Sequence, residues 1–148
     1  MGKWESMGLI DLIFMRHSQL RKLSEKKWSK QSHVPVTNAE WLIIDCIYKQ
    51  PFLTISQVSK MMDITRQAAH KFIKNLRKKG LVKVEPSQRN NREKCLKLTE
   101  QGEAYYKQYV TQKTALEEKI ALALGDEQLL HLKNILSADW GLSEEEAG

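Results

Sequence analysis

The stretch from residue 54 to residue 99 constrains the fold of this chain more than any other. Its pattern predicts a short helix, a tight turn, a second helix and a basic hairpin, in that order. Thr65 can cap the second helix, which we expect over residues 65–79. Gly80 should end that helix, because glycine tolerates the left-handed conformation at a helix C-terminus.

The second helix has two faces of different chemistry. Apolar side chains recur at helical spacing on one face, namely Ala69, Phe72, Ile73 and Leu76. The other faces carry basic and hydrogen-bonding side chains, namely Arg66, Gln67, His70, Lys71, Lys74 and Arg77. A helix of this kind fits the major groove of DNA. The alternative is a solvated amphipathic helix, but the ordered assembly of helix, turn, helix and basic hairpin favours nucleic acid.

The start of this helix is where side chains would meet base edges. Arg66 suits guanine and Gln67 suits adenine, each through paired hydrogen bonds, although both could instead contact phosphates only. Lys71 and Lys74 are more suited to phosphate, and Ala68 is either a thymine-methyl contact or a filler. The residues expected to contact DNA from this helix are Thr65, Arg66, Gln67, Ala68, His70, Lys71 and Lys74.

Positive charge is concentrated in the same stretch. The whole chain of 148 residues has a formal net charge of +6. Residues 60–94 contain eleven Lys and Arg against three Asp and Glu, a net charge of +8, so the remaining residues together carry −2. Clustered positive charge in a segment that bears a motif is typical of phosphate binding.

After Gly80 the apolar pattern changes to a period of two, which predicts a hairpin. We expect strands over residues 81–85 and 93–98, with Leu96 and Leu98 on the buried face. The connection between the strands, residues 87–92, is entirely polar and contains Arg89, Asn90 and Arg92. The hairpin is therefore expected to be a wing with a basic tip.

Two capping boxes mark helix starts earlier in the chain. Thr37 and Glu40 open a helix expected over residues 37–50, which is apolar on most of its surface and therefore central. Thr54 and Gln57 open the first helix of the motif.

Longer helices flank the motif. Residues 4–30 have apolar side chains near helical spacing, and this helix must end before Pro35, because the residue before a proline is displaced from helical geometry. Thr99 can cap a long helix that runs to Leu124, and Asp126 can cap a final helix.

These flanking helices have more apolar surface than one small winged domain can cover, which predicts a homodimer. An isologous dimer would place two recognition helices about one DNA turn apart. We expect a mainly α fold with a small β-hairpin wing, a single domain over residues 1–148. Its winged helix-turn-helix would span residues 36–100, and residues 3–34 and 101–140 would be dimerisation helices.

This layout resembles the MarR (multiple-antibiotic-resistance regulator) family of bacterial transcription factors over nearly the whole chain. The resemblance depends on three motifs, Thr65-Arg66-Gln67-Ala68-Ala69-His70, Leu76-x-x-x-Gly80-Leu81-Val82 and Leu98-Thr99-x-x-Gly102. It implies an obligate dimer, a pseudopalindromic operator in double-stranded DNA, and repression that a small ligand or oxidation relieves.

The wing departs from the family pattern at one position. The family usually has Asp-x-Arg before the Leu-Thr pair, and the matching residues here are Asn90-Asn91-Arg92. The resemblance implies that Arg92 lies in the minor groove. Asn90 can accept a hydrogen bond from Arg92 but adds no charge to orient it.

Aromatic side chains from several helices could line an effector pocket, namely Trp28, Trp41, Tyr105, Tyr106 and Tyr109. Plain core packing is the favoured alternative for each of them. Cys46 is expected to be a buried inert thiol, whereas Cys95 shares a strand face with Lys97 and is expected to be partly exposed.

Other function classes are disfavoured by the sequence. It has no metal-binding motif, no phosphate-cradling glycine loop and no nucleophile elbow, so we expect neither an enzyme nor a cofactor. Apolar runs such as residues 41–44 are far too short to cross a membrane. The N-terminus has no secretion signal and the cysteines form no scaffold, so the cytoplasm is expected. Two rival functions remain, a module that docks an acidic protein and an architectural DNA-binding protein without sequence preference.

Overall fold

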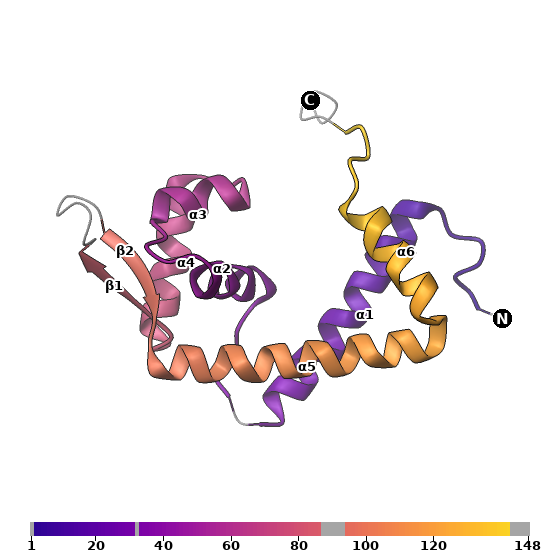
Figure 1. Cartoon of the computed structure of the whole chain (residues 1–148), viewed down its shortest axis with the longest axis horizontal. Helices are drawn as coiled ribbons and strands as arrows, with labels where there is room; N and C mark the ends of the chain where they lie inside the picture. The colour runs from indigo at the N-terminus through magenta and orange to yellow at the C-terminus, as the bar shows by residue number, and fades with distance from the viewer. Residues whose placement is uncertain (1, 32, 87–93, 143–148) are drawn as a thin grey trace. The chain divides into compact units, whose positions relative to one another are not determined.

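The computed structural model describes residues 2–31, 33–86 and 94–142, which form six helices and one two-stranded antiparallel sheet. Along the chain these elements are α1 (Leu9–Ser29), α2 (Asn38–Lys49), α3 (Ile55–Met62), α4 (Arg66–Lys78), β1 (Val82–Pro86), β2 (Lys94–Leu98), α5 (Glu100–Leu124) and α6 (Asp126–Ser137) (Figure 1). The predicted fold class, mainly α with a β-hairpin after a helix-turn-helix, is confirmed. The chain divides into two compact units, residues 1–107 and 108–148, and α5 begins in the first and ends in the second.

The first helix is shorter than predicted. It begins at Leu9 rather than near residue 4, and Gly8 is its N-cap with an extended backbone at φ −70° and ψ 167°. Residues before it form a turn instead, in which the backbone N–H of Glu5 donates to the carbonyl of Gly2. Glycine costs about 1 kcal/mol relative to alanine within a helix, so Gly8 disfavours extension of the helix back toward residue 4.

Both predicted capping boxes are present. The Thr37 hydroxyl accepts from the Glu40 N–H at 3.2 Å, and Glu40 Oε1 accepts from the Thr37 N–H at 3.0 Å. The corresponding distances between Thr54 and Gln57 are 3.2 and 2.9 Å. Each box satisfies backbone donors that would otherwise lack a partner, and so fixes where α2 and α3 begin.

The core lies in the first unit, with α2 at its centre as predicted. Ile43 and Ile44 of α2 are fully buried. They belong to an apolar cluster contributed by all the elements of the motif, whose most buried members also include Leu53, Val58, Ala69, Leu76, Leu81 and Leu96. This core positions the exposed face of α4, because one side of α4 contributes to it.

The hairpin starts one residue later than predicted. Leu81 is fully buried and its N–H donates to the Leu76 carbonyl at 3.0 Å, so it closes α4 instead of joining the strand. The strands pair antiparallel with Val82 opposite Leu98 and Val84 opposite Leu96. Leu96 and Leu98 are buried as predicted.

The expectation that Cys95 is partly exposed is wrong, because only 2% of its surface is accessible. Strand alternation predicts one buried face for a free hairpin, but β2 is not a free edge. The Leu96 N–H donates to the Leu53 carbonyl at 2.7 Å, and β2 also contacts α2 and α3. Cys95 and Leu96, on opposite faces of β2, are therefore both buried, although Lys97 remains exposed.

A single threonine joins α4, the hairpin and α5. The Thr99 hydroxyl accepts from the Gly102 N–H at 3.0 Å, which confirms its predicted role as the cap of α5. The same hydroxyl donates to the Gly80 carbonyl at 2.6 Å, and the Thr99 N–H donates to the Leu81 carbonyl at 3.0 Å. Gly80 has φ +77°, the left-handed conformation expected after α4.

In the second unit, Asp126 is not the cap that the sequence predicted. Gly125 is the N-cap of α6, with φ 90° and no side-chain cap, and Asp126 is the first helical residue. An acid in a first helical turn is still favourable there, because it complements the positive end of the helix dipole. None of the helices in the described part of the chain is both long and apolar enough to cross a membrane.

We predict that Gly102→Ala strongly destabilises the protein. A Cβ at this position would lie 2.1 Å from the Leu81 carbonyl oxygen, which is backbone and cannot rotate away. Forced overpacking of this kind lowers the free energy of unfolding by about 3 kcal/mol, measured by chemical denaturation. Gly2→Ala is the control, because its Cβ meets nothing nearer than the Trp4 nitrogen at 3.6 Å. Equal stabilities of the two variants would contradict the prediction.

Candidate nucleic-acid interface

The turn between α3 and α4 is held by a serine that the sequence reasoning missed. Asp63 ends α3 in a left-handed conformation with φ 52°. The Ser59 hydroxyl then donates to the Ile64 carbonyl at 2.8 Å, and the Ile64 N–H donates back to the Ser59 carbonyl at 3.1 Å. A serine in the last turn of a helix, followed by an Asp that tolerates φ > 0, was the available signal.

Thr65 fixes the start of α4. Its backbone is extended, at φ −67° and ψ 156°, and its hydroxyl accepts from the Ala68 N–H at 3.0 Å. Ala69, Ile73 and Leu76 of the helix are buried, as the sequence predicted. The opposite face is consequently presented to solvent.

The structure brings most of the predicted contact residues on α4 together. Arg66 and Gln67 are exposed, whereas Ala68 is half-buried. An open surface depression of about 500 Å³ is lined by Thr65, Gln67, Ala68, His70, Lys71 and Lys74. Arg66 lies on the same helix but does not line this depression.

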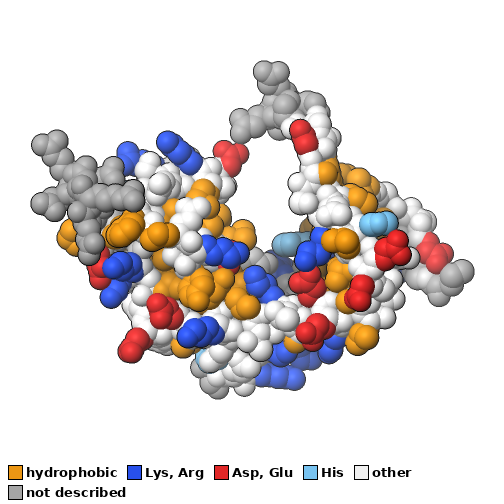
Figure 2. Space-filling view, viewed as in Figure 1, with side chains coloured by type: hydrophobic (Ala, Val, Ile, Leu, Met, Phe, Trp, Pro, Cys, Tyr) orange, Lys and Arg blue, Asp and Glu red, His pale blue; other side chains and the backbone are white. Residues whose placement is uncertain are grey.

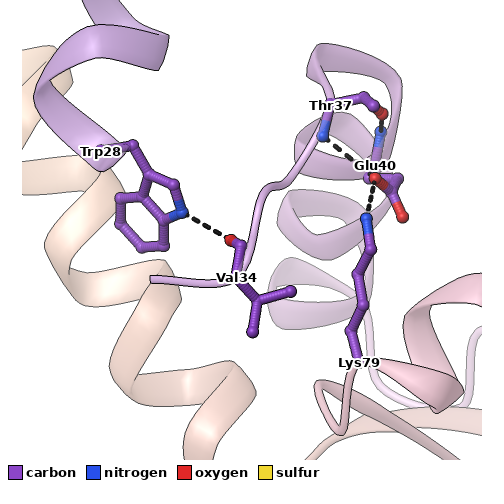
Figure 3. Close-up of polar contacts among 5 residues, drawn as sticks. All are labelled: Trp28, Val34, Thr37, Glu40 and Lys79. Carbon is purple, nitrogen blue, oxygen red and sulfur yellow. Dashed lines mark hydrogen bonds and ion pairs between the residues drawn. The ribbon is translucent and has the colours of Figure 1, made fainter. Parts of the chain in front are cut away.

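The cations of α4 differ in whether an acid already neutralises them. Arg66, Lys71 and Lys74 are exposed and form no ion pair with any described residue. Lys79, at the end of the helix, instead forms an ion pair with Glu40 (Figure 3). Two of the uncompensated cations, Lys71 and Lys74, therefore lie on the face that carries Gln67.

The strands of the wing carry two lysines that share one carboxylate. Glu85 contacts both Lys83 and Lys97 at 3.2 Å. The hydrogen bond from Lys97, and then the one from Lys83, hold the pKa of the Glu85 carboxyl below its usual range. Arg89, Asn90 and Arg92, predicted for the wing tip, lie outside the described residues, so their roles stay predictions.

Three of the aromatic residues predicted for an effector pocket pack against one another. Trp28 meets Trp41 edge-on at 5.0 Å between ring centroids and Tyr105 at 4.8 Å, and all three are buried. The Trp28 indole N–H donates to the Val34 carbonyl at 2.8 Å (Figure 3). The Val34 N–H donates to the Tyr105 hydroxyl at 3.1 Å. This cluster, which also includes His33 4.2 Å from Trp28, joins the end of α1 to α2 and α5.

The remaining two aromatic residues lie elsewhere. Tyr106 stacks on Tyr48 at 4.1 Å, and its hydroxyl donates to Asp45 at 2.8 Å. Tyr109 belongs to the second unit, where the Lys113 ammonium lies 4.4 Å from its ring centroid. The five residues therefore occupy three settings, and the effector pocket stays a prediction.

Neither a reactive thiol nor a metal centre is evident where the structure describes the chain. Cys46 is half-buried, and burial, followed by the negative charge of Asp45, raises the pKa of its thiol, which disfavours the reactive thiolate. No group of three metal-ligating side chains occurs among the described residues.

Comparison with known proteins gives the same assignment for the motif. Residues 36–94 match the model of the MarR family. Among curated proteins, no sequence matches the chain.

Solved structures of that family share the fold. Streptococcus pneumoniae FabT in complex with DNA is 23% identical with a TM-score of 0.77, and the match covers 87% of this chain and 90% of that one. The S. aureus MepR–DNA complex is 18% identical with a TM-score of 0.74, over 90% and 94% of the two chains. Wild-type MarR from E. coli, in its apo form, is 22% identical with a TM-score of 0.67, over 89% and 96%.

We predict that Thr65→Ala destabilises the start of α4, whereas Thr65→Ser does not. The alanine variant loses the acceptor for the Ala68 N–H, which costs about 1 kcal/mol at a helix N-cap, and serine keeps it. Chemical denaturation measures the stability, and amide hydrogen exchange at Ala68 reports the local effect. Equal behaviour of the two variants would show that the cap is dispensable.

Proposed function

We propose that the chain is a MarR-family transcriptional regulator that binds double-stranded DNA as a homodimer, because residues 36–94 match the model of that family. The observation that carries the proposal is the exposed face of α4. This face begins at a capped N-terminus, presents Gln67 beside Lys71 and Lys74, and has no acid paired to either lysine among the described residues.

The proposed division of labour follows from chemistry. The first turn of α4 enters the major groove, where Arg66 and Gln67 meet base edges. Lys71 and Lys74, one or two turns further along, contact phosphates and fix the register on the duplex. Arg92 of the wing is proposed to reach the adjacent minor groove, and Arg89 and Asn90 are proposed as further DNA contacts.

The dimer is proposed from apolar surface that the isolated chain leaves exposed. Figure 2 shows hydrophobic side chains (orange) at the surface over α6. In α6 and just after it these are Leu130, Leu132, Ile135, Leu136, Trp140 and Leu142, each at least 41% exposed. In α1 they include Leu9, Ile10, Phe14 and Leu23. We assign residues 3–34 and 101–140 to dimerisation and residues 36–100 to DNA binding.

The regulatory mode completes the proposal. The protein acts in the cytoplasm as a repressor on a pseudopalindromic operator, and a small ligand releases it. Its role is regulation and not catalysis.

The experiment that tests this function is selection of bound sequences from a random duplex pool, followed by affinity titration of the selected duplex at two salt concentrations. A dimeric regulator enriches an inverted repeat with half-sites about one helical turn apart. Its affinity falls steeply with salt, because neutralised phosphates release counterions. Binding that shows no salt dependence for any duplex would overturn the proposal.

We predict that Gln67→Ala and Lys71→Ala have different effects on DNA binding. Gln67→Ala loses discrimination of about 1–3 kcal/mol at one base pair, because the paired hydrogen bonds to a base are gone. Lys71→Ala weakens binding to all sequences alike and reduces the slope of log affinity against log salt by about 1. Titration of single-base variants of the selected duplex measures both. If Gln67→Ala left sequence preference unchanged, the helix would not read bases through this side chain.

We predict that Ile135→Glu dissociates the homodimer. Burial of an isoleucine contributes about 1.5–3 kcal/mol, so a charge in its place raises the dimer dissociation constant at least about tenfold. Sedimentation over a concentration series measures the constant. Asn134→Glu is the matched control, because it adds the same charge at an exposed polar position of α6. A wild-type protein that is monomeric at all concentrations would contradict the dimer.

A further inference from the structure

A buried ion pair links the end of α4 to the start of α2 (Figure 3). The Lys79 ammonium lies 2.7 Å from Glu40 Oε1, and their side chains are 24% and 3% exposed. The same Oε1 accepts the Thr37 N–H at 3.0 Å. Glu40 is therefore both half of the α2 capping box and the anionic partner of Lys79.

The Glu40 carboxylate depends on this cation. Its other oxygen, Oε2, is buried and accepts no hydrogen bond from any described residue. Desolvation of two charges offsets most of the attraction between them, so a buried ion pair is a weak source of stability. Such a pair nevertheless requires its two groups to stay in contact, because separating them or removing one partner leaves an uncompensated buried charge. The pair therefore favours one arrangement of the two helices over alternatives.

Lys79 is placed differently from the other cations of α4. It is the C-cap of the helix and precedes Gly80, where the chain turns toward the hairpin. Its charge is compensated by Glu40, whereas Lys71 and Lys74 have no acidic partner among the described residues. It is consequently poorly suited to be a phosphate contact.

We propose that Glu40 and Lys79 are positioning residues that fix the orientation of α4 relative to α2 and thereby control discrimination between the preferred duplex and other DNA. This inference rests on the proposed function. The anchor is firm, because Glu40 precedes the fully buried Ile43 and Ile44 in the same helix. Hydrogen bonds to bases require a narrow range of distance and angle, whereas attraction to phosphate extends over a Debye length, so a shift of α4 affects base reading first.

The test uses the full chain and four variants. Glu40→Gln keeps an oxygen for the Thr37 N–H but removes the charge, and Lys79→Met removes the cation while keeping an apolar stem. The double variant removes both charges. Lys78→Met is the matched control, since it removes a charge from the exposed neighbouring residue. Affinities for the selected duplex and for a shuffled duplex of the same composition are titrated at several salt concentrations, with a melting curve for each variant.

Each single variant is expected to lower the ratio of the affinity for the selected duplex to that for the shuffled duplex about tenfold. This is the effect expected when one hydrogen-bonded contact to a base is weakened. The salt slope stays at the wild-type value, because the number of neutralised phosphates is unchanged. The double variant melts above Lys79→Met, because no unpaired charge remains buried, yet its affinity ratio stays low. Lys78→Met changes both affinities by the same factor.

Two results would overturn the inference. In the first, Lys79→Met lowers both affinities equally and makes the salt slope shallower, as loss of a phosphate contact does. In the second, the double variant regains both the wild-type affinity ratio and the wild-type stability. The pair would then affect only the stability of the fold and not the reading of bases. If Lys79→Met does not fold, Glu40→Gln alone gives the comparison. A wild-type protein that binds neither duplex is a separate outcome, because it would overturn the proposed function itself.

Discussion

The Thr99 side chain and backbone make the contacts on which the rest of the first unit depends. Its hydroxyl donates to Gly80 and accepts from Gly102, and its N–H donates to Leu81. The end of α4, the start of the hairpin and the start of α5 each have backbone groups without a partner inside their own element. Thr99 forms hydrogen bonds with one such group from each of them. Close approach is possible because Gly102 has no side chain to displace the Leu81 carbonyl. The C-terminal end of α4 is therefore tied to the hairpin and to α5 by this node, whereas the cap at Thr65 defines where the helix begins.

Most of what the sequence predicted correctly is local. Capping boxes, the N-caps at Thr65 and Thr99, and the left-handed Gly80 depend on residues within one turn of each other, so their spacing is visible in the sequence. The buried face of α4 follows equally from helical periodicity. For the described residues, the face of α4 predicted to contact DNA could thus be identified from capping motifs and helical periodicity alone.

What could not be predicted depends on residues far apart in the chain. The ion pair between Glu40 and Lys79 joins positions 39 residues apart, and nothing in the local pattern of either residue indicates it. The burial of Cys95 depends on the segment at Leu53 lying beside β2, which strand alternation does not reveal. The late start of α1 is a different kind of error, since the prediction did not include the cost of placing Gly8 inside a helix.

The exposed apolar side chains of α1 and α6 set a condition on stability as well as on assembly. Contiguous exposed apolar surface is rare on monomeric proteins and marks an interaction surface. If a second copy of the chain covers it, the free energy of unfolding includes the free energy of association and rises with protein concentration. The stability of the second unit, which has no buried residue in α6, would then depend on the partner more than that of the first.

Salt separates the two kinds of electrostatic interaction in the first unit. The exposed cations Lys71 and Lys74, which we propose as phosphate contacts, would act through solvent, where the Debye length is about 8 Å at physiological ionic strength. The pair between Glu40 and Lys79 is largely shielded from solvent, so added salt weakens it much less. Rising salt should therefore reduce the affinity for all DNA while leaving the arrangement of α4 on α2 unchanged. Specificity should then persist as affinity falls, because the residues proposed to position α4 differ from the residues proposed to attract the duplex.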